Sequence, residues 1–319
     1  MRKNESQLLA ETATIVSQQQ SMKCESAAEA VLATASLADL ADHYGFQIMP
    51  EIGRGAFGVV YAAYDRSSRE IVALKTIKIK NNRQMIHDEF NQINTLNNLE
   101  IPNRLIVAHD QVFENDLCAF FALKKGVCDL VGCKGAPGTI PRLHGMPLQQ
   151  RTPHVKRIFQ DIMLFLEGIH AAGIFHADIK PEQMLEMPDG STTVCDYGMM
   201  HKNNLTCGTS GTPIYMAPEV ADRSAGLPAY DAGPADIYSA GLTLFAMIAC
   251  NHPYKEGDGP RKSLLDNATS RRRIAEAGAE ELLFGPFGML RDPGQRPTAT
   301  DVLKNNWLTE EDAPPMNVE

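Results

Sequence analysis

The 319-residue chain has a mass of 35.0 kDa and can bury a sizeable core as one large domain or two modest lobes. Its 44% hydrophobic and 22% charged residues argue against fibrous and wholly disordered classes. The formal net charge of -9 disfavours nucleic acid as a main partner, because phosphate backbones are held by clusters of Lys and Arg.

The cysteines and the N-terminus both bear on location. Seven cysteines occur without CxxC pairs or histidines at metal spacing, which predicts reduced thiols in a cytosolic setting. No apolar run approaches the roughly 20 residues needed to span a bilayer. Glu5, Gln7 and Glu11 interrupt the N-terminus before the apolar core of a secretory signal forms. We therefore expect a cytoplasmic protein; delivery into a host cell is an alternative that nothing else in the sequence supports.

Residues 1–45 form an N-terminal extension rich in Ala, Ser, Gln and Glu. Its apolar positions suit one or two short amphipathic helices, and its composition also suits a disordered leader. A second interpretation is a docking or delivery segment, since some translocated bacterial effectors have Ser- and Gln-rich N-termini. The composition favours the leader.

The next elements predict a small sheet and a helix. Two runs rich in β-branched and aromatic residues, 46–65 and 70–79, predict adjacent strands. Apolar positions at helical spacing predict a helix over 83–99 that ends before Pro102. Further strands are expected at 104–113 and 117–124. A loop over 131–147 should follow, because Gly and Pro break any period there.

The C-terminal half is predicted to be mainly helical. A single apolar stripe predicts a helix over 154–173. The most apolar segment, 235–250, predicts a buried central helix, and 298–308 predicts one final short helix.

A glycine-rich turn precedes a lysine on the following strand. Gly53, Gly55 and Gly58 would let backbone N–H groups approach phosphate oxygens, although three glycines also suit a tight hairpin. Strand rather than helix follows them, which excludes a dinucleotide-binding fold. Lys75 in "VALK" would reach phosphates under this turn, or would be a solvated strand lysine. The glycines and Lys75 therefore do not decide the function by themselves.

Three later motifs resolve that ambiguity by their order and spacing. They are "HADIKPEQM" at 176–184, "CDYG" at 195–198 and "GTPIYMAPE" at 211–219. Together with Lys75 they make residues 46–308 resemble the eukaryotic-type protein kinase family, and specifically its serine/threonine members. The resemblance implies an α+β, two-lobed protein-kinase-like fold with a small β-rich N-lobe at 46–124 and a larger helical C-lobe at 125–308. Nucleotide would bind between the lobes, and 309–319 would be an acidic C-terminal tail.

The same resemblance assigns roles for ATP-dependent phosphoryl transfer to a Ser or Thr hydroxyl of a protein substrate. Asp178 would be the catalytic base and Lys180 would stabilise the transferring phosphoryl group. Asp196 and Gln183 would hold Mg²⁺. The residues implied to contact ATP are Ile52, Gly53, Gly55, Gly58, Val60, Ala73, Lys75, Leu123, Lys125 and Leu185.

Four further residues match structural positions of the family. Glu219 is expected to pair with Arg296, and Asp236 to brace the catalytic loop through backbone N–H groups. Thr212 stands where serine/threonine kinases bond the catalytic aspartate and lysine. Thr206, Thr209 and Ser210 lie in the preceding loop, where phosphorylation and no regulation at all are both open interpretations.

Three departures from the family pattern bear on activity. Ala177 replaces the arginine that commonly precedes the catalytic aspartate, so a clamp for a phosphorylated loop is missing. Gln183 replaces a metal-binding asparagine, which shifts the amide oxygen by about 1.5 Å and makes Mn²⁺ an alternative metal. Counting back from Pro102 puts Gln92 where a helix carboxylate should pair with Lys75, and Glu89 one turn earlier is the alternative.

These departures keep two other functions open. A pseudokinase would keep the fold, and nucleotide affinity with it, as a scaffold with little turnover. Phosphorylation of a small molecule is a third interpretation, which "GTPIYMAPE" disfavours because that region cradles a peptide acceptor in the family. We expect an active protein kinase; oligomeric state and protein substrate do not follow from the sequence.

Overall fold

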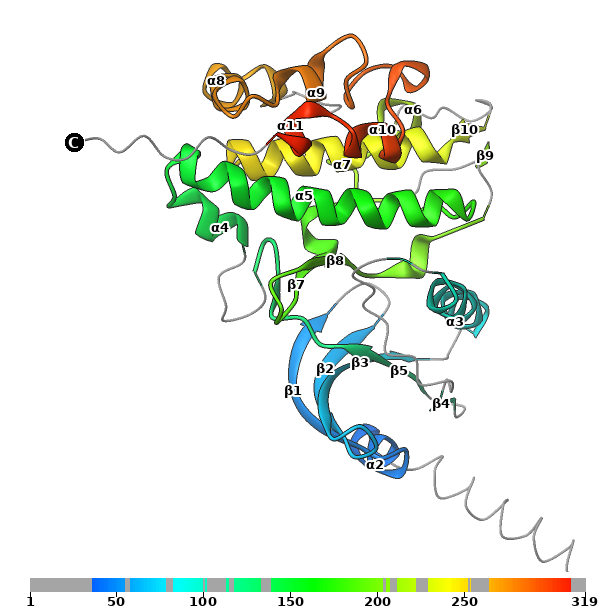
Figure 1. Cartoon of the computed structure of the whole chain (residues 1–319). Coiled ribbons are helices and arrows are strands. Elements are labelled where there is room, and N and C mark those ends of the chain that lie inside the picture. The colour runs from blue at the N-terminus through cyan, green and yellow to red at the C-terminus, as the bar shows by residue number, and fades with distance from the viewer. Residues whose placement is uncertain are drawn as a thin grey trace, which may run out of the picture. The chain divides into compact units, whose positions relative to one another are not determined.

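The fold was examined in a computed structural model of the chain (Figure 1). The structure describes residues 36–54, 58–78, 83–99, 101, 113–114, 118–132, 139–202, 205–206, 211–221, 229–251, 253 and 264–310. It divides into two compact units: the first contains residues 1–83 and 109–121, and the second contains 84–108 and 122–319. Residues 84–99 of the predicted helix belong to the second unit by their contacts. The lobe boundary at 124 stays a prediction.

The first unit is built on an antiparallel sheet of strand order β1-β2-β3-β5-β4. Helix α2 (Leu37–His43) packs on β1 and is capped by Ser36, whose side chain and that of Asp39 form a capping box. The strands expected within 46–65, 70–79 and 117–124 are present, whereas the strand expected at 104–113 lies outside the described residues except for Phe113. Their bounds are β1 (Phe46–Arg54), β2 (Val59–Asp65), β3 (Glu70–Lys78), β4 (Phe113–Glu114) and β5 (Cys118–Lys124), the last of which continues into the second unit.

The second unit is mainly helical and is centred on α7 (Ala232–Ala249), as predicted. Figure 1 shows α7 alongside α5 (Leu148–Ala171), and the two helices pack against each other. By length and composition α7 could cross a membrane, but 83% of it is buried inside the protein. That burial is typical of the core helix of a folded domain.

Helix α3 (Arg83–Asn97) and a set of short helices complete the second unit. Two of them are α8 (Ala268–Glu276) and α9 (Glu280–Phe284). Near the end of the described chain, α10 (Ala299–Leu303) packs on α5 and is followed by α11 (Asn306–Thr309). Smaller elements are α6 (Pro218–Ala221), β9 (Leu205–Thr206), β10 (Tyr230–Asp231) and the 3₁₀ turns η3 (Leu264–Asp266) and η4 (Pro293–Gln295).

Three sequence predictions about helices were wrong in detail. The expected loop at 131–147 contains α4 (Thr139–His144), because Pro141 lies in the first turn, where no intrahelical N–H is needed. Helix α5 begins six residues before the predicted start at 154 and runs through Pro153, which lies inside the helix and removes one of its backbone hydrogen bonds. The single final helix is two helices, because the Asn305 side chain caps a new start at Trp307 N.

A three-stranded sheet of the second unit positions the candidate site. Its strands β6 (Cys128–Asp129), β7 (Met184–Glu186) and β8 (Thr192–Val194) pair antiparallel in that order. The β7–β8 turn is closed by Asp189, whose side chain accepts from Ser191 N at 2.9 Å, and by Gly190 at φ 81°. Because this hairpin pairs Met184 with Val194, the residues just outside it are brought side by side.

Candidate active site

The catalytic-loop motif begins where α5 ends. Gly173 adopts a φ of +70°, and Ile174 N donates to Ile169 O at 2.9 Å, which closes the helix and turns the chain back. Phe175 then pairs with His201 through two backbone hydrogen bonds of 3.0 and 3.1 Å. The loop is therefore fixed at its entry, before the predicted catalytic residue Asp178 is reached.

Asp236 of α7 binds the backbone of the next two residues, His176 and Ala177. Its carboxylate accepts from His176 N at 2.8 Å, from Ala177 N at 2.9 Å and from His170 Nε2 at 3.0 Å. Burial opposes its ionisation, but the His170 hydrogen bond and the neighbouring imidazoles outweigh burial, so the pKa of Asp236 lies below its ordinary value. The predicted brace is therefore present, and His170 adds a third bond.

Two residues of the catalytic loop are under local constraint. Ala177 has a φ of 64°, a left-handed conformation that costs energy for a residue with a Cβ and that the bond to Asp236 maintains. The His176 imidazole is fully buried, with Nε2 3.2 Å from Cys195 O and Nδ1 accepting from Asp178 N at 3.3 Å. Burial lowers its pKa, and a neutral ring satisfies both partners.

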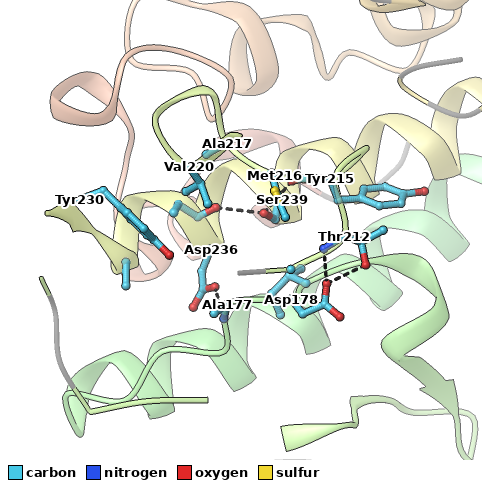
Figure 2. A pocket seen from close by; sticks show the side chains of 14 residues that line it. Ala177, Asp178, Thr212, Tyr215, Met216, Ala217, Val220, Tyr230, Asp236 and Ser239 are labelled. Carbon is cyan, nitrogen blue, oxygen red and sulfur yellow. Dashed lines mark hydrogen bonds between the residues drawn. The ribbon is translucent and has the colours of Figure 1, made fainter. Parts of the chain in front are cut away.

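Asp178 is the centre of a hydrogen-bonded group. Lys180 Nζ donates to its Oδ2 at 2.7 Å, while Thr212 N and Oγ1 donate to its Oδ1 at 2.7 and 2.8 Å. Lys180 Nζ also reaches Thr212 Oγ1 at 2.6 Å. Figure 2 shows Thr212 beside the Asp178 carboxylate, with both bonds drawn. The structure thus brings together three residues that the sequence predicted to act together.

A small cavity of about 20 Å³ adjoins this group (Figure 2). It lies between the catalytic loop, the segment after Gly211 and α7, and Ala177 contributes only a methyl group to its wall. A cavity of this size holds about one water molecule, so it is no nucleotide site.

Gln183 and Asp196 face each other across the β7–β8 hairpin. Gln183 Nε2 donates to Asp196 Oδ2 at 3.0 Å and lies 3.3 Å from Asp178 Oδ2. Its Oε1 points the other way and accepts from Cys195 Sγ at 3.7 Å. The carboxamide therefore reaches both acidic groups in spite of its extra methylene, but it presents nitrogen to them.

The position of helix α3 shows which of its side chains lies beside the turn that contains Asp196. Glu89 is buried, and a Cβ built on Gly198 would lie 3.9 Å from Glu89 Oε2. Gln92, the position suggested by counting from Pro102, instead donates its Nε2 to Met200 O. Within the second unit, Glu89 is thus a carboxylate beside the "DYG" turn, whereas its pairing with Lys75 stays a prediction.

The expected structural ion pair is present at the other end of the segment. Arg296 donates to both carboxylate oxygens of Glu219, at 2.5 and 2.9 Å, and to the carbonyls of Pro234 and Arg291 at 2.9 and 2.7 Å. Its guanidinium also lies 4.8 Å from the Tyr238 ring. The pair fixes α6, and with it the end of the "GTPIYMAPE" segment.

The first unit aligns three predicted nucleotide-binding residues by strand register. Gly53 of β1 pairs with Val60 of β2, and Val60 pairs with Lys75 of β3. Ala73 lies two residues from Lys75 on the same face. Ile52 lies on β1 next to Gly53. Gly55 falls outside the described residues.

Gly58 is required for the close approach of β3, whether or not it contacts a nucleotide. A Cβ built there would lie 2.3 Å from Thr76 O, so no larger residue fits without moving the strand.

In the second unit, Gly126 brings the remaining predicted nucleotide contacts together. A Cβ built on Gly126 would lie 3.2 Å from the Leu185 Cβ, so the chain after Leu123 runs close to β7. Lys125 turns its Nζ to Gly126 O at 3.2 Å. Leu123 and Leu185 are both only partly buried, which leaves apolar surface at this point.

Comparison with known proteins gives this geometry its context. Residues 46–308 match the protein kinase domain family. The chain belongs to the eukaryotic-type serine/threonine protein kinase family. Its β-rich first unit and helical second unit are the two parts of the predicted α+β kinase fold.

Three curated relatives illustrate the similarity of this kinase domain. It is 25% identical over 311 residues to the calcium/calmodulin-dependent protein kinase kinase of Caenorhabditis elegans, covering 86% of this chain and 54% of that one. It is 27% identical over 268 residues to the serine/threonine-protein kinase PEPKR2 of Arabidopsis thaliana, covering 81% and 52%. It is 29% identical over 213 residues to CBL-interacting protein kinase 12 of Oryza sativa, covering 64% and 36%. The chain spans about half or less of the length of these relatives.

Sequence analysis of the kinase domain missed two side chains at the site. His170 bonds Asp236, from which it is separated by 66 residues, and no local pattern indicates such a contact. Cys195 contacts Gln183, and its position directly before a predicted metal ligand was the signal that could have drawn attention to it. Both act on residues that the sequence had already identified.

Proposed function

We propose that the chain is an ATP- and Mg²⁺-dependent kinase that phosphorylates Ser and Thr hydroxyls of protein substrates. One observation carries the proposal: the Asp178 carboxylate is bonded at once by the Lys180 ammonium and by both donors of Thr212. A base, a cation and a group of the acceptor-binding segment are thereby arranged for one reaction.

Each of these residues then has a defined task in the transfer. Asp178 accepts a hydrogen bond from the substrate hydroxyl, orients its oxygen and takes its proton as the new O–P bond forms and the bond from the γ-phosphorus to the bridging oxygen of ATP breaks, with ADP as the leaving group. Lys180 offsets negative charge on the group in transfer, and its bonds to Asp178 and Thr212 already fix its position. When bound, ATP supplies the phosphoryl group and Mg²⁺ neutralises phosphate charge.

The donor set of the second unit suits Mg²⁺. Among the described residues, no group of three or more His, Cys, Asp or Glu side chains is arranged to hold a metal ion. Mg²⁺ in phosphoryl-transfer enzymes commonly takes one or two carboxylates together with substrate phosphates, so Asp196 with the nearby Gln183 carboxamide is an adequate set. Gln183 can contribute its carboxamide oxygen after the amide group rotates by half a turn.

The first unit supplies side chains suited to the nucleotide. Lys75 is buried, and it pairs with Val60, which in turn pairs with Gly53. The lysine ammonium and the backbone of a glycine therefore lie on neighbouring positions of the sheet. That pairing suits phosphate oxygens. The apolar Ala73 and, in the second unit, Leu185 suit an adenine ring.

An assay of phosphoryl transfer tests the proposal directly. The purified chain is incubated with γ-labelled ATP and a mixed Ser/Thr peptide library, first with Mg²⁺ and then with Mn²⁺. Asp178→Asn is the control, because it keeps the shape of the side chain but removes the base. We expect label on Ser and Thr that the control loses.

The same assay decides the pseudokinase alternative, which is motivated by the nitrogen that Gln183 presents to both carboxylates. Nucleotide binding without any transfer in either metal would establish the scaffold function. Transfer that Asp178→Asn leaves intact would show that a contaminant or another site is responsible, and would overturn the mechanism above.

A further inference from the structure

The Gln183 carboxamide occupies the position between two carboxylates that a cation would neutralise. Its Nε2 carries two hydrogens and has two acceptors, Asp196 Oδ2 at 3.0 Å and Asp178 Oδ2 at 3.3 Å. The residue is only 8% exposed, so water contributes little here. In this state the amide stands in for positive charge and holds the two acidic side chains together.

The other end of the same carboxamide is held by a thiol. Cys195 Sγ donates to Gln183 Oε1 at 3.7 Å, a length suited to a sulfur donor. The backbones of the two residues are also tied, since Cys195 N donates to Gln183 O at 2.8 Å. His176 Nε2, 3.2 Å from Cys195 O, fixes the thiol's own peptide. Gln183 and Cys195 can therefore change their mutual arrangement only by side-chain rotation.

Cation binding requires the opposite orientation of the amide. Mg²⁺ and Mn²⁺ are bound by oxygen, and a carboxamide ligates them through its carbonyl oxygen. Rotation of the amide by half a turn would present Oε1 to Asp196 and would bring the NH₂ group against Cys195. The rotation therefore breaks the bond from Cys195 Sγ to Gln183 Oε1 and requires the thiol to turn its hydrogen away from the NH₂ group.

We propose that Cys195 is a positioning residue that sets the orientation of the Gln183 carboxamide and thereby weakens divalent-cation binding beside Asp196. The thiol stabilises the amide orientation that excludes the cation, and the cation must break this bond in order to recruit Gln183. The inference rests on the proposed function, because it concerns the metal that this function uses. It explains how a glutamine at this position makes metal affinity adjustable from a neighbouring residue.

The test measures metal affinity rather than turnover. Mn²⁺ is titrated into protein saturated with a non-hydrolysable ATP analogue, and free Mn²⁺ is followed by its electron paramagnetic resonance signal. The variants are Cys195→Ala and Cys195→Val, which both remove the donor while Val keeps most of the volume. Each is also made in a Gln183→Asn background. Cys250→Ala is the matched control, since that thiol contacts Arg151 and Met247 O instead of Gln183.

We expect both Cys195 variants to tighten the dissociation constant of Mn²⁺ by roughly two- to fivefold, the effect of one weak hydrogen bond. In the Gln183→Asn background the change should vanish, because the shorter amide no longer spans from the thiol to the carboxylates. Unchanged or weaker affinity in both Cys195 variants, or an equal change in the Asn background, would overturn the inference. Wild-type protein that binds nucleotide but no Mn²⁺ would overturn the proposed function itself.

Discussion

Replacing Arg296 by methionine tests what holds the segment 211–219 in place. The substitution keeps an unbranched stem but removes every donor, and the arginine side chain it replaces is 0% exposed. Four bonds are lost: two to the Glu219 carboxylate and one each to the carbonyls of Pro234 and Arg291. Glu219, which is 19% exposed, would then be a largely buried carboxylate without its cation.

The expected cost is about 3–5 kcal/mol of unfolding free energy, the range for breaking one side of a buried ion pair. Most of this cost arises from the Glu219 carboxylate, which remains charged without its cation. The double variant Glu219→Gln, Arg296→Met should therefore lose clearly less unfolding free energy than the sum of the two single variants. Urea denaturation of the four proteins, followed by far-UV circular dichroism, measures both quantities. A loss below about 1 kcal/mol for Arg296→Met, or strictly additive costs, would refute the argument that the pair is energetically coupled.

Three further predictions concern the catalytic loop. Gly211→Ala should reduce turnover strongly, because φ is +101° and the added Cβ would lie 2.6 Å from Ala177 O, whereas Gly294→Ala, with nothing within 4 Å, should be neutral in the same peptide assay. Thr212→Val should lower kcat at nearly constant KM while Thr212→Ser retains activity, since the hydroxyl bonds Asp178 and Lys180; equal losses in steady-state kinetics would contradict this role. Burial lowers the pKa of His176, so as the pH falls the unfolded chain binds a proton at this imidazole before the folded chain does. The free energy of unfolding should therefore fall, by at most about 1.4 kcal/mol per pH unit, as the pH drops below about 6.5. His176→Phe should flatten that slope in urea titrations.

The order of chemical motifs is what the sequence specified best. A lysine on a strand, a loop carboxylate with a lysine two residues on, and a second carboxylate before glycine are each common by themselves. Their conjunction predicted that Asp178, Lys180 and Thr212 act together, and the structure places them in one hydrogen-bonded group. Uniform hydrophobicity was equally informative for α7, because a helix that is apolar on all sides has to be buried.

Contacts between distant segments were beyond prediction from a local pattern. Counting from Pro102 suggested Gln92 as the residue in the carboxylate position, yet the helix turns Glu89 toward the Asp196 turn and leaves Gln92 to Met200 O. An error of less than one helical turn decides between these two outcomes, and helix boundaries read from sequence are uncertain by that much. The role of His170 was hidden for a related reason, since it depends on how α5 packs against α7.

Hydrogen bonds to Asp236 support the loop around Ala177, the residue that we expect to replace the arginine common in the family. The loop is held by Asp236, whose three bonds come from His170 and from the backbone of His176 and Ala177. Two of the three donors are backbone groups, so they persist whichever side chain follows His176. An arginine side chain at position 177 is therefore not needed to hold these bonds in the loop that carries Asp178. The bond from Ala177 N to Asp236 also maintains the left-handed conformation at that residue, so α7 fixes the backbone of the loop directly before Asp178.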